Sequence, residues 1–114
     1  MSWVFKLEAP LHGFTISTGR SLWTKRAKAY AAWKEYVRLT ANAAKVPQEI
    51  PENERWGVRT MIYWKKKARI DPENVQKGIQ DALWTHDRRV SAGSYQSFEN
   101  VGTERCEVGV WRVT

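Results

Sequence analysis

The 114-residue sequence predicts a single α+β domain, in which two helices pack on a small mixed sheet of four strands. Two observations support this fold class. Four segments alternate apolar and polar residues with the period of strands, and two segments repeat apolar residues every three or four positions, as helices do. These segments follow one another as strand, helix, strand, helix, strand, strand. Because 114 residues accommodate one hydrophobic core, residues 1–114 are expected to form one domain.

The first half of the sequence predicts a strand and a long helix. Residues 3–7 alternate bulky and polar side chains, which favours a short strand. The region around Gly13 and Gly19 is typical of a flexible turn or hairpin tip. Residues 25–44 predict an amphipathic helix. Its apolar positions are Ala29, Ala32, Trp33, Tyr36, Val37, Thr40 and Ala44.

The second half predicts three strands and a shorter helix. A polar connection with Pro47 and Pro51 leads into a strand at residues 58–65, which is apolar enough on both faces to be largely covered. A helix is expected over residues 72–83, with Asp71 as N-cap and Pro72 at its first position. Two further strands are expected near residues 88–98 and 105–113. The turn between these two strands would be formed by Asn100, Val101 and Gly102.

Charge and cysteine content narrow the classes of function. The net charge of +7 comes from 19 basic and 12 acidic residues and favours phosphate-rich partners or an anionic surface. Cys106 is the single cysteine, which excludes an intramolecular disulfide, a thiolate zinc cage and a cysteine-rich secreted framework. This cysteine content favours an intracellular, reducing location. Since no apolar run approaches about 18 residues, we expect a soluble protein.

One segment of this basic chain is rich in acids. On the helix predicted at residues 72–83, Glu73, Lys77 and Asp81 lie at i, i+4 and i+8, beside Asn74. The opposite side of that helix is apolar. Two carboxylates about 4 Å apart repel by about 4 kcal/mol at an effective dielectric constant near 20, so a converged group needs compensation, usually by a divalent cation. The apolar residues are Val75, Ile79, Ala82 and Leu83.

Taken alone, the row of Glu73, Lys77 and Asp81 is explained more simply as a salt-bridge ladder on a solvated helix. The neighbouring residues favour a functional role for these side chains. A capping role for Asp71 requires neither Glu73 nor Asp87, and a basic run leads directly into the acids. Groups that attract phosphate and groups that bind metal are therefore adjacent in the chain. The basic run consists of Lys65, Lys66, Lys67 and Arg69.

Residues 69–90 resemble the core motif of the RusA-like Holliday junction resolvases. The family pattern is Asp-x-Asp-Asn-x-x-Lys, then Asp-Ala-Leu, then Asp-Asp before a strand. The corresponding residues here are Asp71-Pro72-Glu73-Asn74-Val75-Gln76-Lys77, Asp81-Ala82-Leu83 and His86-Asp87. Residues 24–33 are similar to the basic, tyrosine-containing start of the family's long helix. Glu73 and His86 stand where the family has aspartates, and the link from Leu83 to Asp87 is shorter.

The resemblance implies a small α/β domain that forms a homodimer on the two-fold axis of a four-way DNA junction and cleaves its strands. It implies one or two Mg²⁺ ions, with Mn²⁺ as a substitute, bound by Asp71, Glu73 and Asp87. Asn74 would orient a ligand or water, and Asp81 would hold Lys77 against the phosphate. The implied catalytic residues are Asp71, Glu73, Lys77 and Asp87. His86 is left out, because a lone histidine in a connection is more often neither ligand nor base.

DNA contacts are expected from basic side chains near the glycine-containing turn and near the acids. Phe14 and Trp23 flank that turn and are candidates for wedging into an opened junction. Core packing is the expected role of Trp33, Trp64 and Trp111. The candidate DNA-binding residues are Arg20, Lys25, Arg26, Lys28, Lys65, Lys66, Lys67, Arg88 and Arg89.

Two other functions stay open on sequence alone. One is a catalytically weak or inactive junction-binding protein of the same family, since two family acids are replaced. The other is an RNA-binding or protein-interaction module in which the acids only cap a helix and form salt bridges. The family resemblance places the protein in the cytoplasm, encoded by a bacterium or a phage.

Overall fold

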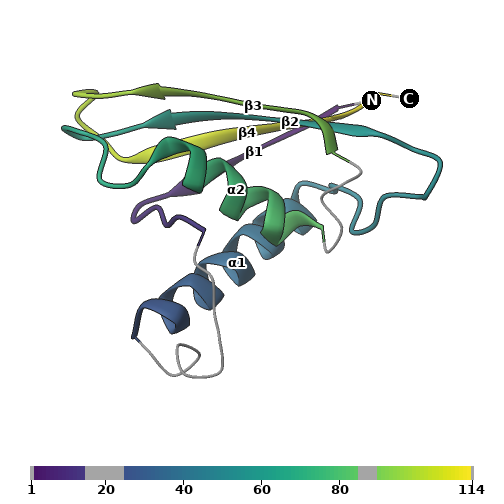
Figure 1. Ribbon diagram of the computed structural model, residues 1–114, viewed down its shortest axis with the longest axis horizontal. Coiled ribbons are helices and arrows are strands. Elements are labelled where there is room, and N and C mark those ends of the chain that lie inside the picture. Colours follow the sequence, from purple (N-terminus) through teal and green to yellow (C-terminus); the bar gives the residue numbers. More distant parts are fainter. Residues whose placement is uncertain (1, 15–24, 85–89, 114) are drawn as a thin grey trace.

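The structure, a computed structural model, describes residues 2–14, 25–84 and 90–113. It confirms an α+β fold in which two helices accompany a four-stranded mixed sheet (Figure 1). The elements, in chain order, are β1 (Ser2–Glu8), α1 (Lys25–Ala43), β2 (Trp56–Tyr63), α2 (Pro72–Leu83), β3 (Val90–Phe98) and β4 (Arg105–Arg112).

The strands are arranged in the order β1-β4-β2-β3. β4 runs antiparallel to both β1 and β2, whereas β3 runs parallel to β2. The last two strands are thus not neighbours, and the predicted turn between them crosses the end of β2. Its amides bond to the residues that follow β2: Asn100 N donates to Lys66 O at 2.7 Å, and Val101 N donates to Trp64 O at 2.9 Å.

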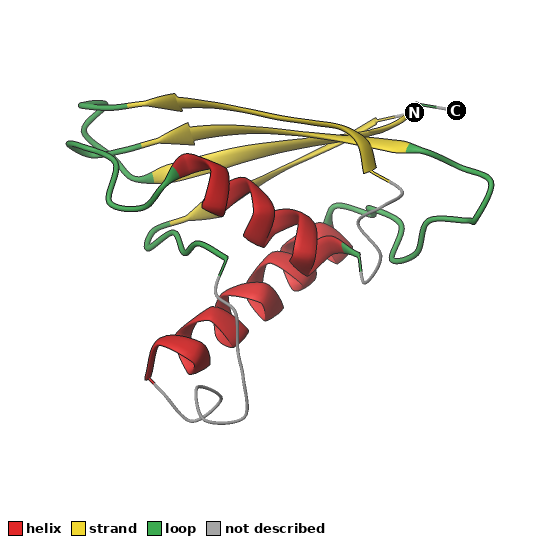
Figure 2. Ribbon diagram, in the orientation of Figure 1, coloured by secondary structure: helices red, strands yellow, loops and turns green. Residues whose placement is uncertain are grey.

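Both helices lie on the same side of the sheet (Figure 2). α2 packs against β2 and β3, while α1 packs against α2 and β1. Apolar side chains from α2 and from the inner side of the strands fill the space between these layers, so burial of this inner face is the main source of stability. Fully buried residues of this core include Leu7, Val58, Ile62, Trp64, Val75, Ile79, Cys106, Val108 and Val110.

The expectation that the strand near residues 58–65 is covered on both faces is wrong. Val58 and Ile62 are fully buried on the inner side of β2, but Arg59 on the other side is exposed, and Met61 and Tyr63 are partly exposed. The physical reason is that both helices of the described ranges occupy one face. The other face of the sheet is open among the described residues. Trp111 lies on this face over Gly57, so the prediction that it packs in the core is wrong.

The apolar side of α1 is rotated from the prediction. Trp33 and Val37 are buried as expected, but Ala32 is exposed. An alanine says little about orientation because its small side chain is tolerated on either side of a helix. The large aromatic residues set the orientation instead. The buried residues of α1 are Ala27, Tyr30, Trp33, Val37 and Ala41.

The structure also bears on the single cysteine and on membrane-spanning segments. Cys106 is fully buried, and burial raises the pKa of its thiol to about 12, so the side chain packs as a small apolar group. Neither helix in the described part of the chain combines the length and the hydropathy needed to cross a membrane.

The open sheet face yields a test with a matched control. A Cβ atom at Gly57 would overlap the indole ring of Trp111, whereas a Cβ at Gly109 would meet no atom closer than Arg59 O at 3.9 Å. We expect Gly57→Ala to displace the indole and to lower the free energy of unfolding by about 1–3 kcal/mol. Gly109→Ala should be neutral or slightly stabilising. Urea denaturation of both variants measures this, and equal stabilities would contradict the packing of Trp111 on Gly57.

Candidate functional site

The N-terminus of α2 is built as the sequence predicts. Asp71 caps the helix, because its Oδ1 accepts a hydrogen bond from Glu73 N at 3.0 Å. Pro72 occupies the first helical position, where its missing N–H group costs nothing. Asp71 and Glu73 are both exposed. Two carboxylates therefore face solvent in the first turn of α2.

The two sides of α2 also match the prediction. Val75, Ile79, Ala82 and Leu83 are buried, whereas the opposite side presents Glu73, Asn74 and Lys77 to solvent. The apolar side fixes the rotation of the helix about its axis. One carboxylate, one amide and one amine are thereby brought onto a single exposed surface.

Asp81 belongs to a different contact, which corrects the prediction that it holds Lys77. Its Oδ2 accepts a hydrogen bond from the Tyr30 hydroxyl at 2.8 Å and lies 3.4 Å from Lys34 Nζ. Burial, together with the hydrogen bond to Asp81, raises the pKa of the Tyr30 hydroxyl, so Tyr30 stays neutral and donates. Asp81 therefore ties α2 to α1.

Lys77 contacts the segment that follows β1 instead. Its Nζ lies 5.0 Å from the centre of the Phe14 ring, a cation–π contact, and that ring packs edge-on against Tyr30. Phe14 N also donates to Asn74 O at 2.9 Å. Phe14, the predicted wedge, is thus attached to α2 one turn beyond Glu73, and entering a junction would require its ring to leave Tyr30 and Lys77.

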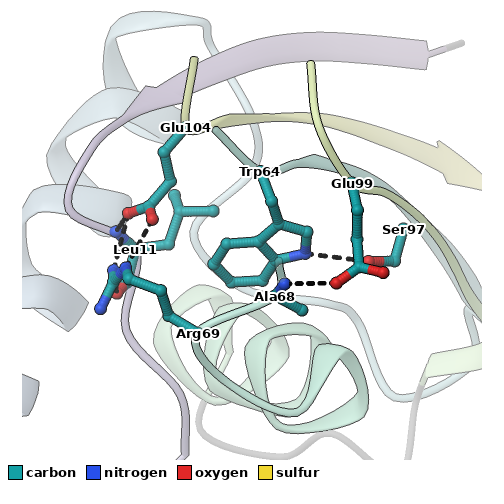
Figure 3. A network of polar contacts seen from close by, with 7 residues as sticks. All are labelled: Leu11, Trp64, Ala68, Arg69, Ser97, Glu99 and Glu104. Atoms are coloured by element: carbon teal, nitrogen blue, oxygen red, sulfur yellow. Dashed lines mark hydrogen bonds and ion pairs between the residues drawn. The ribbon is translucent and has the colours of Figure 1, made fainter. Parts of the chain in front are cut away.

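The lysine-rich segment between β2 and α2 is held by its backbone, which leaves its side chains exposed. Lys65 and Lys66 accept hydrogen bonds through their carbonyl groups from the turn at residues 100–102. Ala68 N donates to Glu99 Oε2 at 2.6 Å, and the buried Trp64 indole donates to Ser97 Oγ at 2.9 Å (Figure 3). The exposed cations of this segment are Lys65, Lys66 and Lys67.

An ion pair fixes the last residues before α2. Figure 3 shows the Arg69 guanidinium facing the Glu104 carboxylate, with Nε and Nη2 at 2.6 and 2.7 Å from its two oxygens. Leu11 N donates to Glu104 Oε2 at 2.8 Å, and Arg69 Nη2 donates to Leu11 O at 3.1 Å. Mainly because of the hydrogen bonds from Arg69, the pKa of Glu104 lies below its usual value. Sequence reasoning missed Glu104, since nothing local links it to Arg69.

Three residues of the predicted basic surface lie in the first turn of α1. Arg26, at the start of α1, lines a hollow of about 240 Å³ together with His12, Phe14 and Asn74. Lys25 and Lys28 are exposed on the same first turn of α1. One predicted DNA-binding cation of α1 therefore shares a hollow with Asn74 of α2.

Several predicted site residues lie outside the described part of the chain, and their placement remains a prediction. In the ranges that are described, no three acidic, histidine or cysteine side chains gather closely enough to hold a metal ion. Asp71 and Glu73 supply two carboxylates, whose oxygens are the ligand type that Mg²⁺ prefers. The residues outside the described ranges are Arg20, Trp23, His86, Asp87, Arg88 and Arg89.

Comparison with known proteins adds no assignment. A scan against protein-family models and a search of curated proteins find no match to this chain.

The Arg69–Glu104 contact predicts a pH-dependent stability. We expect Glu104→Gln to lower the free energy of unfolding by about 1–2 kcal/mol near neutral pH, because one charge-assisted pair is lost at a partly exposed site. Since the pKa of Glu104 is lowered in the folded state, its contribution is complete above the ordinary value of 4.5 and is lost as pH falls through the folded value.

Urea denaturation of the wild type and the variant, from neutral pH to below the ordinary pKa of 4.5, measures the difference in their free energies of unfolding. It should shrink steadily below about pH 4.5. Glu52→Gln, an exposed acid without a contact of this kind in the described structure, serves as the control and should show no such trend. A Glu104→Gln difference that stays constant with pH would contradict the ion pair.

Proposed function

We propose that this protein is a Mg²⁺-dependent, structure-selective endodeoxyribonuclease of the RusA-like type, which resolves four-way DNA junctions during recombination and repair. One observation carries the proposal. The exposed carboxylates of Asp71 and Glu73 stand in the first turn of α2, directly after an exposed lysine segment and one turn before Lys77. This arrangement combines metal-binding oxygens with cations that attract phosphate.

The electrostatics of this surface suit a phosphodiester. Lys65, Lys66 and Lys67 precede the acids on a backbone that is held at several points, so their positive charges stay close to the start of α2. The amide groups at the helix N-terminus add partial positive charge at the same place. The carboxylates alone would repel DNA, and these groups offset that repulsion.

The protein groups have distinct roles in the proposed reaction. Asp71, Glu73 and Asp87 would bind Mg²⁺, which activates water and neutralises charge on the scissile phosphate. Asp71 can cap the helix and bind metal together, because the cap hydrogen bond uses only Oδ1. Lys77 would leave the Phe14 ring to contact the phosphate as a point charge, and Asn74 would orient a ligand or water.

Asp87 is too far from Asp71 along the chain for both to bind one ion within a single copy of the protein. α2 is about 18 Å long, and Asp71 stands at its N-terminal end. Asp87 follows Trp84, at the other end, by three residues, a reach of about 10 Å. We therefore propose a homodimer in which Asp87 of one chain completes the site of Asp71 and Glu73 in the other. By the same resemblance, we place the protein in the cytoplasm of a bacterium, encoded by the host or by a phage.

Replacing Asp71 tests the proposed chemistry. We expect Asp71→Asn to reduce Mg²⁺-dependent nicking of a labelled four-way junction by at least about a hundredfold while junction binding persists. Asparagine caps helices as well as aspartate does, so the fold should survive.

Asp81→Asn is the matched control on the same helix. It removes charge from the Tyr30 and Lys34 contacts and should cost about 1 kcal/mol in stability while cleavage stays within about threefold. Equal cleavage by Asp71→Asn and wild type would refute the proposal. If the wild type binds the junction but does not cut it in Mg²⁺ or Mn²⁺, the protein is a junction-binding protein without nuclease activity.

Mixing two inactive variants tests the shared site. Asp71→Asn and Asp87→Asn should each be inactive. In a co-refolded mixture, half of the dimers are mixed, and each mixed dimer holds one site with both substitutions and one with neither. Nicking should therefore return to about a quarter of the wild-type level. A site built within one chain would carry a substitution in every copy, and the mixture would stay inactive.

A further inference from the structure

A large hollow lies at the end of the sheet remote from Asp71. It measures about 570 Å³ and is bounded by the start of β1, the end of β4 and the connection between α1 and β2. Its aromatic wall consists of Trp3 and Trp56, whose rings stack with centres 5.1 Å apart and planes at 27°. Pro47, Pro51 and Val113 complete the apolar lining.

Several contacts hold this hollow in shape. The Trp56 indole donates to Glu54 Oε2 at 3.0 Å, and Arg112 Nη1 lies 3.1 Å from Glu54 Oε1. The Trp84 ring packs on Trp56 with centres 5.9 Å apart, and its indole donates to Pro47 O at 3.1 Å. Trp56 and Trp84 are buried in the core, so the fold fixes the Trp56 side of the hollow, as in a preformed binding site.

The charge of the hollow is opposite to that of the protein. The connection at residues 47–54 contains Glu49, Glu52 and Glu54 and no lysine or arginine, although the whole chain carries +7. Both oxygens of Glu54 are engaged by Trp56 and Arg112. Glu49 is exposed, lines the hollow and has no polar partner among the described residues. A free carboxylate thus stands beside an aromatic wall.

We propose that this hollow binds the guanidinium group of an arginine side chain presented by a partner protein. A guanidinium is flat, stacks on indole rings and pairs with a carboxylate through two parallel hydrogen bonds, so Trp3 and Glu49 match it in shape and charge. Phosphate groups are disfavoured here because Glu49 repels them, whereas the charge of Glu54 is offset by Arg112. The volume lies within the range of about 300–1,000 Å³ that is common for ligand sites, which leaves room for the backbone beside the arginine.

This site is independent of the proposed nuclease. It surrounds Trp56, the first residue of β2, whereas the acids and lysines follow Tyr63, the last residue of β2. Occupancy should therefore be unchanged by Asp71→Asn.

Titration with a blocked peptide, acetyl-Gly-Arg-Gly-Arg-Gly-amide, tests the inference. Two-dimensional ¹H–¹⁵N NMR of the full chain should show a saturable shift of the Trp3 indole signal, which is identified by its loss in Trp3→Phe. Glu49→Gln should weaken the apparent affinity about tenfold, the effect of losing one charged partner. Glu52→Gln, on the same connection but outside the hollow, should bind like the wild type.

A second peptide with citrulline in place of both arginines separates charge from shape and should cause no saturable shift. The inference fails if the citrulline peptide binds equally, if Glu49→Gln binds like the wild type, or if Glu49→Gln and Glu52→Gln weaken binding alike. Both glutamates are exposed, so neither substitution threatens the fold.

Discussion

The ion pair between Arg69 and Glu104 anchors the segment that leads into α2, and the position of the candidate site depends on that anchor. Glu104 stands just before β4 and also accepts the amide of Leu11, so one carboxylate joins the exit of β1, the entry to β4 and the segment that leads into the helix. Only Ile70 lies between Arg69 and Asp71. The apolar side of α2 then fixes the rotation of the helix against the sheet, and together these constraints set the direction of Glu73 and Lys77.

The parts of the fold that local chemistry determines could be predicted. Asp71 and Pro72 specify a helix start within one turn, and the helix bounds agree with the structure. The face of α1 was misjudged at Ala32, because small residues carry little information about burial. The open face of the sheet could not be predicted, since Met61 and Tyr63 look apolar in the sequence and only the placement of both helices leaves them uncovered.

In the candidate site, too, helical spacing could be predicted from the sequence, whereas contacts between distant segments could not. Glu73, Asn74 and Lys77 share one side of α2 by helical spacing alone, and the structure places them so. The partners of Asp81 and Arg69 could not be predicted, because Tyr30 and Glu104 are 51 and 35 residues away in the chain. Sequence spacing paired Asp81 with Lys77, but a tyrosine on the neighbouring helix offers a partly buried and therefore stronger hydrogen bond. The acidic hollow near Trp3 also arises only from tertiary packing.

The account requires that a divalent ion bind at the start of α2. Diffraction from crystals soaked in Mn²⁺, recorded to reveal its anomalous signal, tests this most directly because it locates the metal itself. We predict one strong peak within bonding distance of carboxylate oxygens of Asp71 and Glu73, completed by Asp87 of a second copy. The absence of a peak at these carboxylates in well-soaked crystals, or a peak only at other acids such as Glu49, would contradict the account.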